Sequence, residues 1–265
     1  MKISELKKEA KVKLSGCYKL AIGINLIHLL ITLVLSYTAS KVDGILSLVV
    51  LLVASLINIP LGYGLTDSML KLSRNATVGI TDFITVGMKN FKRAFFLSLS
   101  IFVRLIIPMI LLIVASILPI IANFVGNIEG SSSGLVSLVA LLLTVSAFIY
   151  FFYKVLSYAL STYILVDNEE AKSKDAIKRS AELMKGNKTR FILMVFSFIG
   201  WLFLAGIFGA IAQGISELLG TIVTYGLSLL LTPYITFTEI NFYEELAGVS
   251  NVAPVEAEVV ESTVE

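Results

Sequence analysis

The sequence alternates between long apolar runs and short charged segments. Six of the apolar runs hold about 17 residues or more, enough to cross a hydrocarbon core about 30 Å thick as α-helices. We expect these spans at about residues 20–36, 45–65, 94–121, 135–166, 191–212 and 221–237. The fold class predicted is therefore an all-α integral membrane protein with six transmembrane helices.

The composition agrees with a membrane protein. Hydrophobic residues make up 57% of the chain and charged residues only 15%, whereas a soluble domain carries about a quarter of its residues as charged side chains. The single cysteine, Cys17, excludes an internal disulfide and a multi-cysteine metal site. No small-residue cleavage pattern follows the first apolar run, so we interpret it as a span that is kept.

The first 19 residues have the pattern of an amphipathic helix. Apolar side chains recur there at helical spacing, while most of the lysines lie off that stripe: the apolar positions are Ile3, Leu6, Ala10, Leu14 and Cys17, and the lysines are Lys7, Lys8, Lys11 and Lys13. A helix of this kind is suited to an anionic membrane surface. A solvated basic leader is the alternative interpretation.

The distribution of lysine and arginine predicts the orientation. The segment 1–19 and the loops 67–93 and 167–190 hold 18 of the 21 basic residues, while the opposite side holds only Lys41. Because basic loops stay on the cytoplasmic side, both termini are expected to be cytoplasmic. Residues 1–246 then form a six-span membrane domain, and the small, polar and acidic residues 247–265 form a disordered tail.

A three-fold pattern runs along the chain. Each odd-numbered span is preceded by a charged segment, a glycine and basic residues. We therefore expect three helical hairpins, each anchored by a cytoplasmic amphipathic helix. In the third such helix, Ser173 is the expected N-cap and Gly186 the expected left-handed stop. Internal duplication and an independent need for basic loops in each hairpin both explain the pattern.

Two cations fall inside apolar runs, and two interpretations of them remain. Arg104 and Lys154 would lie about 15 and 18 Å deep if their helices entered the membrane at residues 94 and 166. At that depth they could form a pocket for a phosphate, a lipid headgroup or a carboxylate. We favour the other interpretation, in which longer helices place both cations at the interface. With Lys188 and Arg190, they are the candidate contacts for an anion or a lipid headgroup.

Other polar or aromatic residues within the spans are expected to have structural roles. Asn25 and Asn58 are interpreted as hydrogen-bond partners between helices. Trp201 lies too deep for the aromatic belt at the interface, and Gly200 and Gly206 flank it. We therefore expect Trp201 to pack against a closely approaching helix.

Several motifs together resemble an uncharacterised bacterial family of integral membrane proteins. The matching residues are Tyr163-Ile164-Leu165 with Asp167-Asn168, Ala176-Ile177 with Ser180, Met184-Lys185-Gly186 with Lys188, Ser197 to Trp201, Thr232-Pro233-Tyr234 and Phe242-Tyr243. The family is domain of unknown function 975, common in Gram-positive bacteria. The resemblance covers nearly the whole chain, although family members often carry proline at the position of Thr162. It implies a multi-pass protein of the cell membrane and supplies no established activity.

No catalytic, cofactor or metal motif is present in the sequence. A Walker loop, a dinucleotide fingerprint, zinc-ligand spacing and a nucleophile elbow are all missing. We expect no enzymatic activity, no cofactor and no nucleic-acid partner, because a membrane surface accounts for the basic loops. The leading hypothesis is a protein that binds anionic lipid or assembles with membrane partners. A small-solute transporter or permease subunit is the alternative, since prolines and glycines interrupt the spans.

Overall fold

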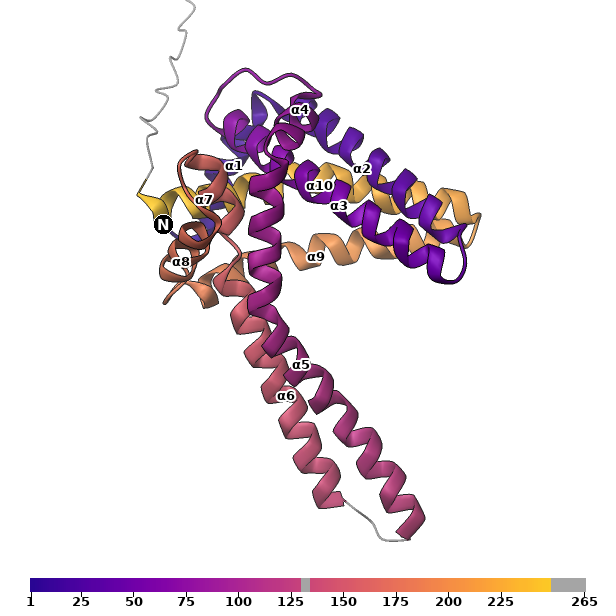
Figure 1. Ribbon diagram of the computed structural model, residues 1–265. Coiled ribbons are helices and arrows are strands. Elements are labelled where there is room, and N and C mark those ends of the chain that lie inside the picture. The colour runs from indigo at the N-terminus through magenta and orange to yellow at the C-terminus, as the bar shows by residue number, and fades with distance from the viewer. Residues whose placement is uncertain (130–133, 249–265) are drawn as a thin grey trace, which may run out of the picture.

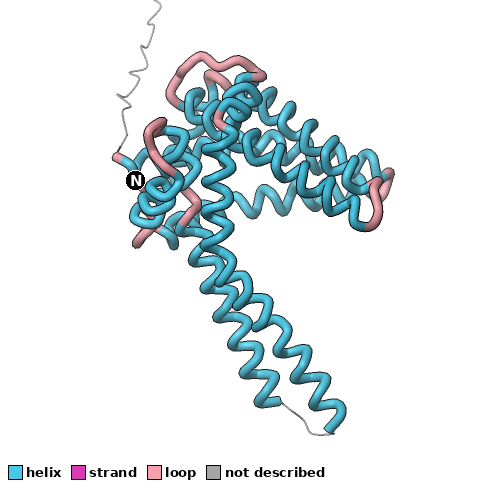
Figure 2. Tube along the Cα trace, in the orientation of Figure 1, coloured by secondary structure: helices cyan, strands magenta, loops and turns pink. Residues whose placement is uncertain are grey.

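The computed structural model describes residues 1–129 and 134–248, and these residues form ten α-helices and no strand (Figure 2). The helices are α1 (Ile3–Ser15), α2 (Tyr18–Ser40), α3 (Ile45–Ser73), α4 (Asp82–Lys89), α5 (Phe91–Glu129), α6 (Gly134–Ser157), α7 (Ser161–Asp167), α8 (Ser173–Leu183), α9 (Lys188–Gln213) and α10 (Glu217–Ala247).

Six helical stretches are long and apolar enough to cross a membrane, as predicted: α2, α3, α5, α6 together with α7, α9 and α10. Three helices run past the predicted ends of their spans, to Ser73, Glu129 and Ala247 instead of residues 65, 121 and 237. Polar residues that follow an apolar run do not by themselves end a helix, and this explains the difference.

The span predicted at residues 135–166 is not one continuous helix. A turn separates Ser157, the last residue of α6, from Ser161, the first residue of α7. The hydroxyl of Ser180 on α8 accepts a hydrogen bond from the Leu160 N–H (3.2 Å) and donates one to the Ser157 carbonyl (2.9 Å). A side chain from another helix thus satisfies backbone groups that the break leaves without helical partners.

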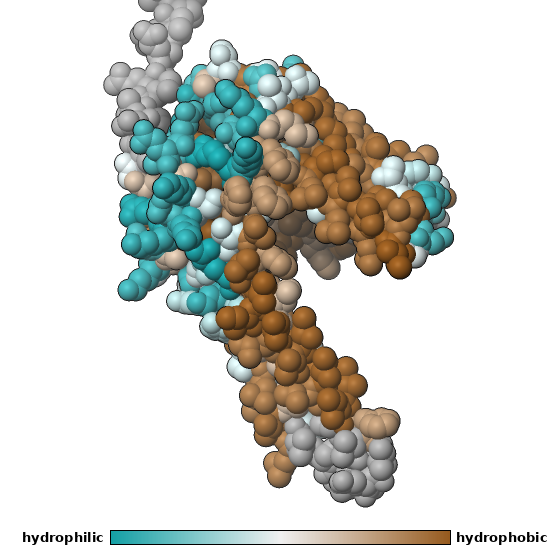
Figure 3. All heavy atoms as spheres, in the orientation of Figure 1, coloured by the Kyte–Doolittle hydropathy of each residue, from teal (hydrophilic) through white to brown (hydrophobic). Residues whose placement is uncertain are grey.

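The helices form two arms that diverge from a common polar head (Figure 1). The polar head comprises α1, α4, α7, α8 and the adjoining ends of the long helices. The four-helix arm contains α2, α3, α9 and α10, and the two-helix arm contains α5 and α6. Figure 3 shows most of the hydrophilic residues over the head, hydrophobic residues over the arms, and a smaller hydrophilic patch at the tip of the four-helix arm. Hydrophilic residues are therefore concentrated mainly at one end of the molecule.

Three short helices, which we call the elbow helices α1, α4 and α8, dock in a cyclic order. Helix α4 packs on α3, α8 packs on α7, and α1 packs on α10. Helices α4 and α8 thus each contact the end of the pair of spans that precedes them in the chain. Helix α1, which comes before the first pair, contacts the end of the third pair. This arrangement joins the three pairs of spans within the head.

The protein core lies in the head. Fully buried side chains come from the elbow helices, the residues next to them and the head ends of the long helices, including α2 and α9, and include Leu6, Phe83, Met184, Phe237 and Phe242. In the arms, most large apolar side chains are exposed. A bilayer would cover these side chains, so the arms depend on lipid for burial.

Of the two helix-end signals predicted around α8, one is confirmed and the other is displaced by one residue. Gly186 has φ +83°, the left-handed conformation that the sequence predicted. The N-cap of α8 is Lys172, one residue before the expected Ser173. Helix α10 ends at Ala247, the first residue of the predicted tail, and its C-cap Gly248 has φ +72°. Of the predicted tail 247–265, residues 249–265 lie outside the described residues.

Two glycines allow α4 to approach α3 closely. A Cβ atom built on Gly64 would lie 1.8 Å from the Phe83 carbonyl oxygen, and one built on Gly87 would lie 2.2 Å from the Pro60 carbonyl oxygen. Neither contact is compatible with a side chain, and both neighbours are backbone atoms. Any larger residue at these positions must therefore separate α3 from α4.

We predict that Gly64→Ala destabilises the protein by about 1–3 kcal/mol, the usual cost of overpacking. Gly62→Ala is the matched control, because a Cβ atom on Gly62 meets nothing within 4 Å; its gain in helix propensity, at most about 1 kcal/mol, favours the fold. Thermal unfolding of both variants in detergent checks the prediction. Equal melting temperatures for the two variants would contradict the close packing of α3 on α4.

Candidate functional site

An ionic network joins the three pairs of spans within the head. Arg74, which follows α3, donates a bidentate pair of hydrogen bonds to Asp167 at the end of α7, with Nη2–Oδ2 at 3.1 Å. Its Nε donates to Glu244 of α10 at 2.8 Å. Lys13 of α1 donates to the other oxygen of Glu244 at 3.0 Å and to Asn241 at 2.8 Å.

The network is largely buried and well satisfied. The side chains of Lys13 and Glu244 are only 8% and 7% exposed. Tyr243 donates a hydrogen bond to Asp167 at 2.9 Å, and its ring stacks on Tyr163 with 5.6 Å between centroids. The hydrogen bond to Asp167, with the one to Glu244, raises the pKa of Arg74 above its ordinary value, although partial burial opposes the shift. Every charge has a partner, so we assign the network to stability.

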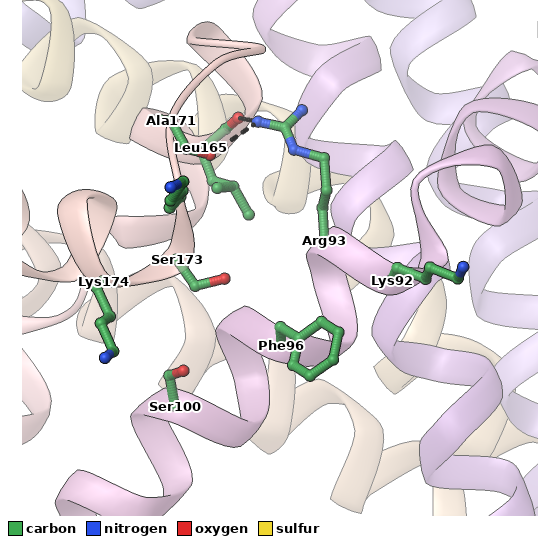
Figure 4. A pocket seen from close by; sticks show the side chains of 9 residues that line it. Lys92, Arg93, Phe96, Ser100, Leu165, Ala171, Ser173 and Lys174 are labelled. Carbon is green, nitrogen blue, oxygen red and sulfur yellow. Dashed lines mark hydrogen bonds between the residues drawn. The ribbon is translucent and has the colours of Figure 1, made fainter.

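A second cluster of cations has no such partners. It lines a groove of about 560 Å³ between the start of α5 and the segment that joins α7 to α8, which we call the basic groove (Figure 4). The groove is lined by four cations, two serines and three apolar residues: Lys92, Arg93, Lys172, Lys174, Ser100, Ser173, Phe96, Leu165 and Ala171. None of the lining residues is acidic.

Arg93 shapes the groove by holding its backbone. The guanidinium donates hydrogen bonds to the carbonyls of Leu165 (3.0 Å), Asn168 (2.8 Å) and Ala171 (3.4 Å), and to the Tyr63 hydroxyl (3.2 Å). A cation beside the last carbonyls of α7 also complements that helix's dipole. Arg93 thereby fixes the loop that carries Lys172, Ser173 and Lys174.

Serine hydroxyls and lysine side chains surround the open centre of the groove. In Figure 4, the hydroxyls of Ser100 and Ser173 face the open centre, while Lys92 and Lys174 extend outwards on its two sides. Lys92, Lys172 and Lys174 are exposed. None of the three lies within ion-pair distance of a carboxylate in the described part of the chain. Their long, flexible side chains can therefore reach a ligand.

The polar face of α5 continues from the groove toward the arm. Arg93, Phe96, Ser100 and Arg104 follow at spacings of three and four, so they share one face of the helix. Arg104 donates a hydrogen bond to the Ser100 carbonyl at 2.8 Å, which bends its guanidinium back toward the head. Arg104 lies one turn beyond Ser100 and is not part of the groove lining; its interfacial position in a membrane stays a prediction.

The other three predicted contacts lie elsewhere. Lys154 lies over the ring of Tyr150, 5.6 Å from its centroid. Lys188 donates hydrogen bonds to the Tyr153 carbonyl (3.1 Å) and the Ser157 hydroxyl (2.6 Å) on α6. Arg190 forms an ion pair with Glu245. The structure thus does not gather the four predicted cations into one site.

Sequence reasoning missed the residues that line the basic groove. Lys92 and Arg93 belonged to one predicted loop and Lys172 and Lys174 to another, and only the packing of α8 and α7 on α5 brings them together. The sequence contains no signal for this cluster, because Glu169, Glu170 and Asp175 flank Lys172 and Lys174 along the chain. Among the described residues, no group of three or more histidine, cysteine, aspartate or glutamate side chains could hold a metal ion.

The expectation for Trp201 was wrong, whereas that for Asn58 was right. Trp201 is 59% exposed, and a Cβ atom on Gly200 or Gly206 would meet nothing within 4 Å, so no helix packs closely on it. Trp201 instead lines an open groove together with residues of α1 and α10. Asn58 of α3 accepts a hydrogen bond from Thr32 of α2 at 3.2 Å.

We predict that Arg74→Ala destabilises the head. Loss of one partner from a buried ion pair costs about 3–5 kcal/mol, and because the Arg74 side chain is 35% exposed, solvent reduces the expected cost to about 1–3 kcal/mol. Arg179→Ala is the control, since its pair with Glu182 is more than half exposed and is worth about 0–1 kcal/mol. Thermal unfolding in detergent measures both costs. An Arg74 variant as stable as the Arg179 variant would show that the network contributes little.

Comparison with known proteins gives one match. The family described as "Protein of unknown function (DUF975)" matches residues 1–250. No curated protein and no solved structure gives a match. The family match covers the polar head, both arms and the basic groove, and it agrees with the resemblance carried by the motifs of the sequence. The chain therefore belongs to the DUF975 family.

Proposed function

We propose that the protein is a non-enzymatic component of the bacterial cell membrane whose basic groove binds the phosphate headgroup of an anionic phospholipid. The observation that carries this proposal is the lining of the groove, which holds four cations and no acid where the polar head meets an apolar arm. Assembly with membrane partner proteins through the same basic surface is the outcome to expect if no lipid binds.

The chemistry of the groove suits a phospholipid. Lysine ammonium groups and serine hydroxyls are donors for phosphate oxygens. The Phe96 side chain is 56% exposed at the edge of the groove and offers an apolar surface for the start of an acyl chain. A basic cluster next to a span is attracted to anionic headgroups by about 1 kcal/mol per lysine or arginine near the surface.

The proposal requires the polar head to face the cytoplasm. The head contains the segments in which lysine and arginine are concentrated, so the positive-inside bias supports this orientation. Both the N-terminus and the C-terminus are then cytoplasmic. The far ends of both arms then face the opposite side of the membrane.

A small-solute transporter or permease subunit is the alternative, and one pocket favours it. A space of about 300 Å³ between α3, α5 and α7 is lined by the polar side chains of Asn58, Tyr63, Thr66, Ser98 and Thr162. Such a pocket is large enough for a small neutral solute. We place this function second, because it also requires access from both sides of the membrane.

We predict that substituting Lys92, Lys172 and Lys174 with glutamine reduces co-purified anionic phospholipid about tenfold or more. Each lysine contributes about 1 kcal/mol of attraction to an anionic headgroup. Protein is released gently from its own membrane, and bound lipid is counted by native mass spectrometry. The matched control substitutes Lys89, Lys178 and Lys185, which belong to the same head and remove the same charge outside the groove.

The control separates a site from general attraction. Retention of anionic lipid by the control and its loss from the groove variant support the proposal. Equal losses in the two variants would assign the binding to the overall charge of the head. Protein that carries no anionic lipid in its unsubstituted form would overturn the proposal.

The orientation gives a separate prediction. A cysteine introduced at Ser137, near the arm end of α6, reacts with a membrane-impermeant thiol reagent added to intact cells, whereas a cysteine at Lys178 on the head does not. Cys17→Ser removes the native thiol in both variants. The reverse labelling pattern would place the head, and both termini, outside the cell.

A further inference from the structure

We propose a second anionic phospholipid site, in a groove that the elbow helix α1 forms with α9 and α10. It lies apart from the basic groove and shares none of its lining residues. The headgroup phosphate is held by Lys7 and Lys11, and the acyl chain follows the apolar surface around Trp201 and Leu230.

Two contacts of Lys7 hold α1 in the position that creates this groove, and a third contact, from Tyr18 at the start of α2, holds the segment that follows α1. The Lys7 ammonium donates to the Ser197 carbonyl of α9 at 3.1 Å and lies 3.9 Å from the centroid of the Phe198 ring. The Tyr18 hydroxyl donates to the Leu230 carbonyl of α10 at 3.0 Å. Helix α1 is thus fixed across α9 and α10 with a space of about 560 Å³ left beside it.

The groove has a polar and an apolar end. Lys7, Lys11 and Ser15 on α1 line one side, whereas Trp201 and Leu230 on the long helices line the other. The Trp201 side chain is 59% exposed and the Leu230 side chain 47% exposed. An amphiphile with an anionic headgroup matches both halves of this surface at once.

The charge at the polar end is not neutralised by the protein. Neither Lys7 nor Lys11 lies within ion-pair distance of a carboxylate among residues 1–129 and 134–248. Lys13 on the same helix, by contrast, is paired with Glu9 and Glu244. Lys7 contacts only a carbonyl and an aromatic ring, so neither lysine is neutralised by a carboxylate. Two such lysines, at the boundary between the head and an apolar arm, favour an anionic over a neutral headgroup.

The occupant is a lipid because the apolar side of the groove belongs to the spans. Trp201 and Leu230 lie on α9 and α10, within helical stretches long enough to cross the bilayer. A soluble anion would leave that surface uncovered, whereas a phospholipid covers the apolar end and neutralises the polar end. The exposure of Trp201 then has a physical reason, since its ring is a surface for an acyl chain.

Trp201 also provides the measurement, because it is the only tryptophan of the chain. The full-length protein is reconstituted in mixed vesicles of phosphatidylglycerol and phosphatidylcholine, in which either the anionic or the neutral lipid carries brominated acyl chains that quench tryptophan fluorescence. At equal mole fractions, we expect brominated phosphatidylglycerol to quench the fluorescence of Trp201 at least about twofold more than brominated phosphatidylcholine does. Equal quenching by the two lipids would overturn the proposal.

Substitutions assign the preference to this groove. Lys7→Gln with Lys11→Gln is expected to abolish the preference for the anionic lipid, while Lys8→Gln with Lys178→Gln, which removes the same charge elsewhere, preserves it. Lys11→Gln alone is expected to lower the preference without loss of the Lys7 contacts that position α1. An unchanged preference in the Lys7, Lys11 variant would overturn the proposal.

The same assay distinguishes this site from the basic groove. The variant with glutamine at Lys92, Lys172 and Lys174 is expected to keep the full preference around Trp201, because those lysines lie in the other groove. Loss of co-purified lipid in that variant, with quenching unchanged, would show two independent sites. If the Lys7, Lys11 variant and the Lys92, Lys172, Lys174 variant lost the preference for quenching by the anionic lipid to the same extent, the preference would reflect general attraction by the head. That result would overturn the second site.

Discussion

The packing of three short helices on the polar ends of the spans is the constraint on which the structure depends. Helices α4 and α8 each cover the end of the span that precedes them, and α1 covers the end of the last span, α10. Nearly all of the fully buried side chains lie in this head, whereas the arms expose their apolar surfaces. Apolar side chains are therefore buried against the rest of the protein in the head and against the bilayer in the arms.

The separation between a packed head and lipid-facing arms also determines where the charged residues lie. Basic residues accumulate in the head, and the packing of the elbow helices determines which of them find partners. Lys13 and Arg74 meet carboxylates, and Arg93 meets carbonyl groups, so these cations hold the head together. Lysines at the rim of the head meet no carboxylate, and they line the grooves that border the arms. The basic residues thus provide both the cohesion of the head and the unneutralised charge on which the proposed lipid sites rest.

The sequence predicted the features that the bilayer imposes. Apolar runs and basic loops revealed six spans and a concentration of charge at one end, because a membrane demands both features of any chain. It could not reveal contacts between distant segments. The partnership of Arg74 with Asp167 and Glu244, and the placement of the Ser180 hydroxyl in the break after α6, arise only when separate loops pack together. Trp201 was misjudged for a related reason, since depth along a span does not show which side of a helix has a neighbour.

The contact between α1 and α10 sets the order in which the head can be completed. Lys13 and Glu244 are 231 positions apart, and at roughly 5–20 residues per second, synthesis separates them by tens of seconds. Helices α4 and α8 meet their partners in adjacent segments much earlier. During that interval α1 must rest elsewhere, and an amphipathic helix has the bilayer surface available. Of the contacts that the three elbow helices make with the span ends, the one between α1 and α10 is therefore the last whose two partners are both synthesised.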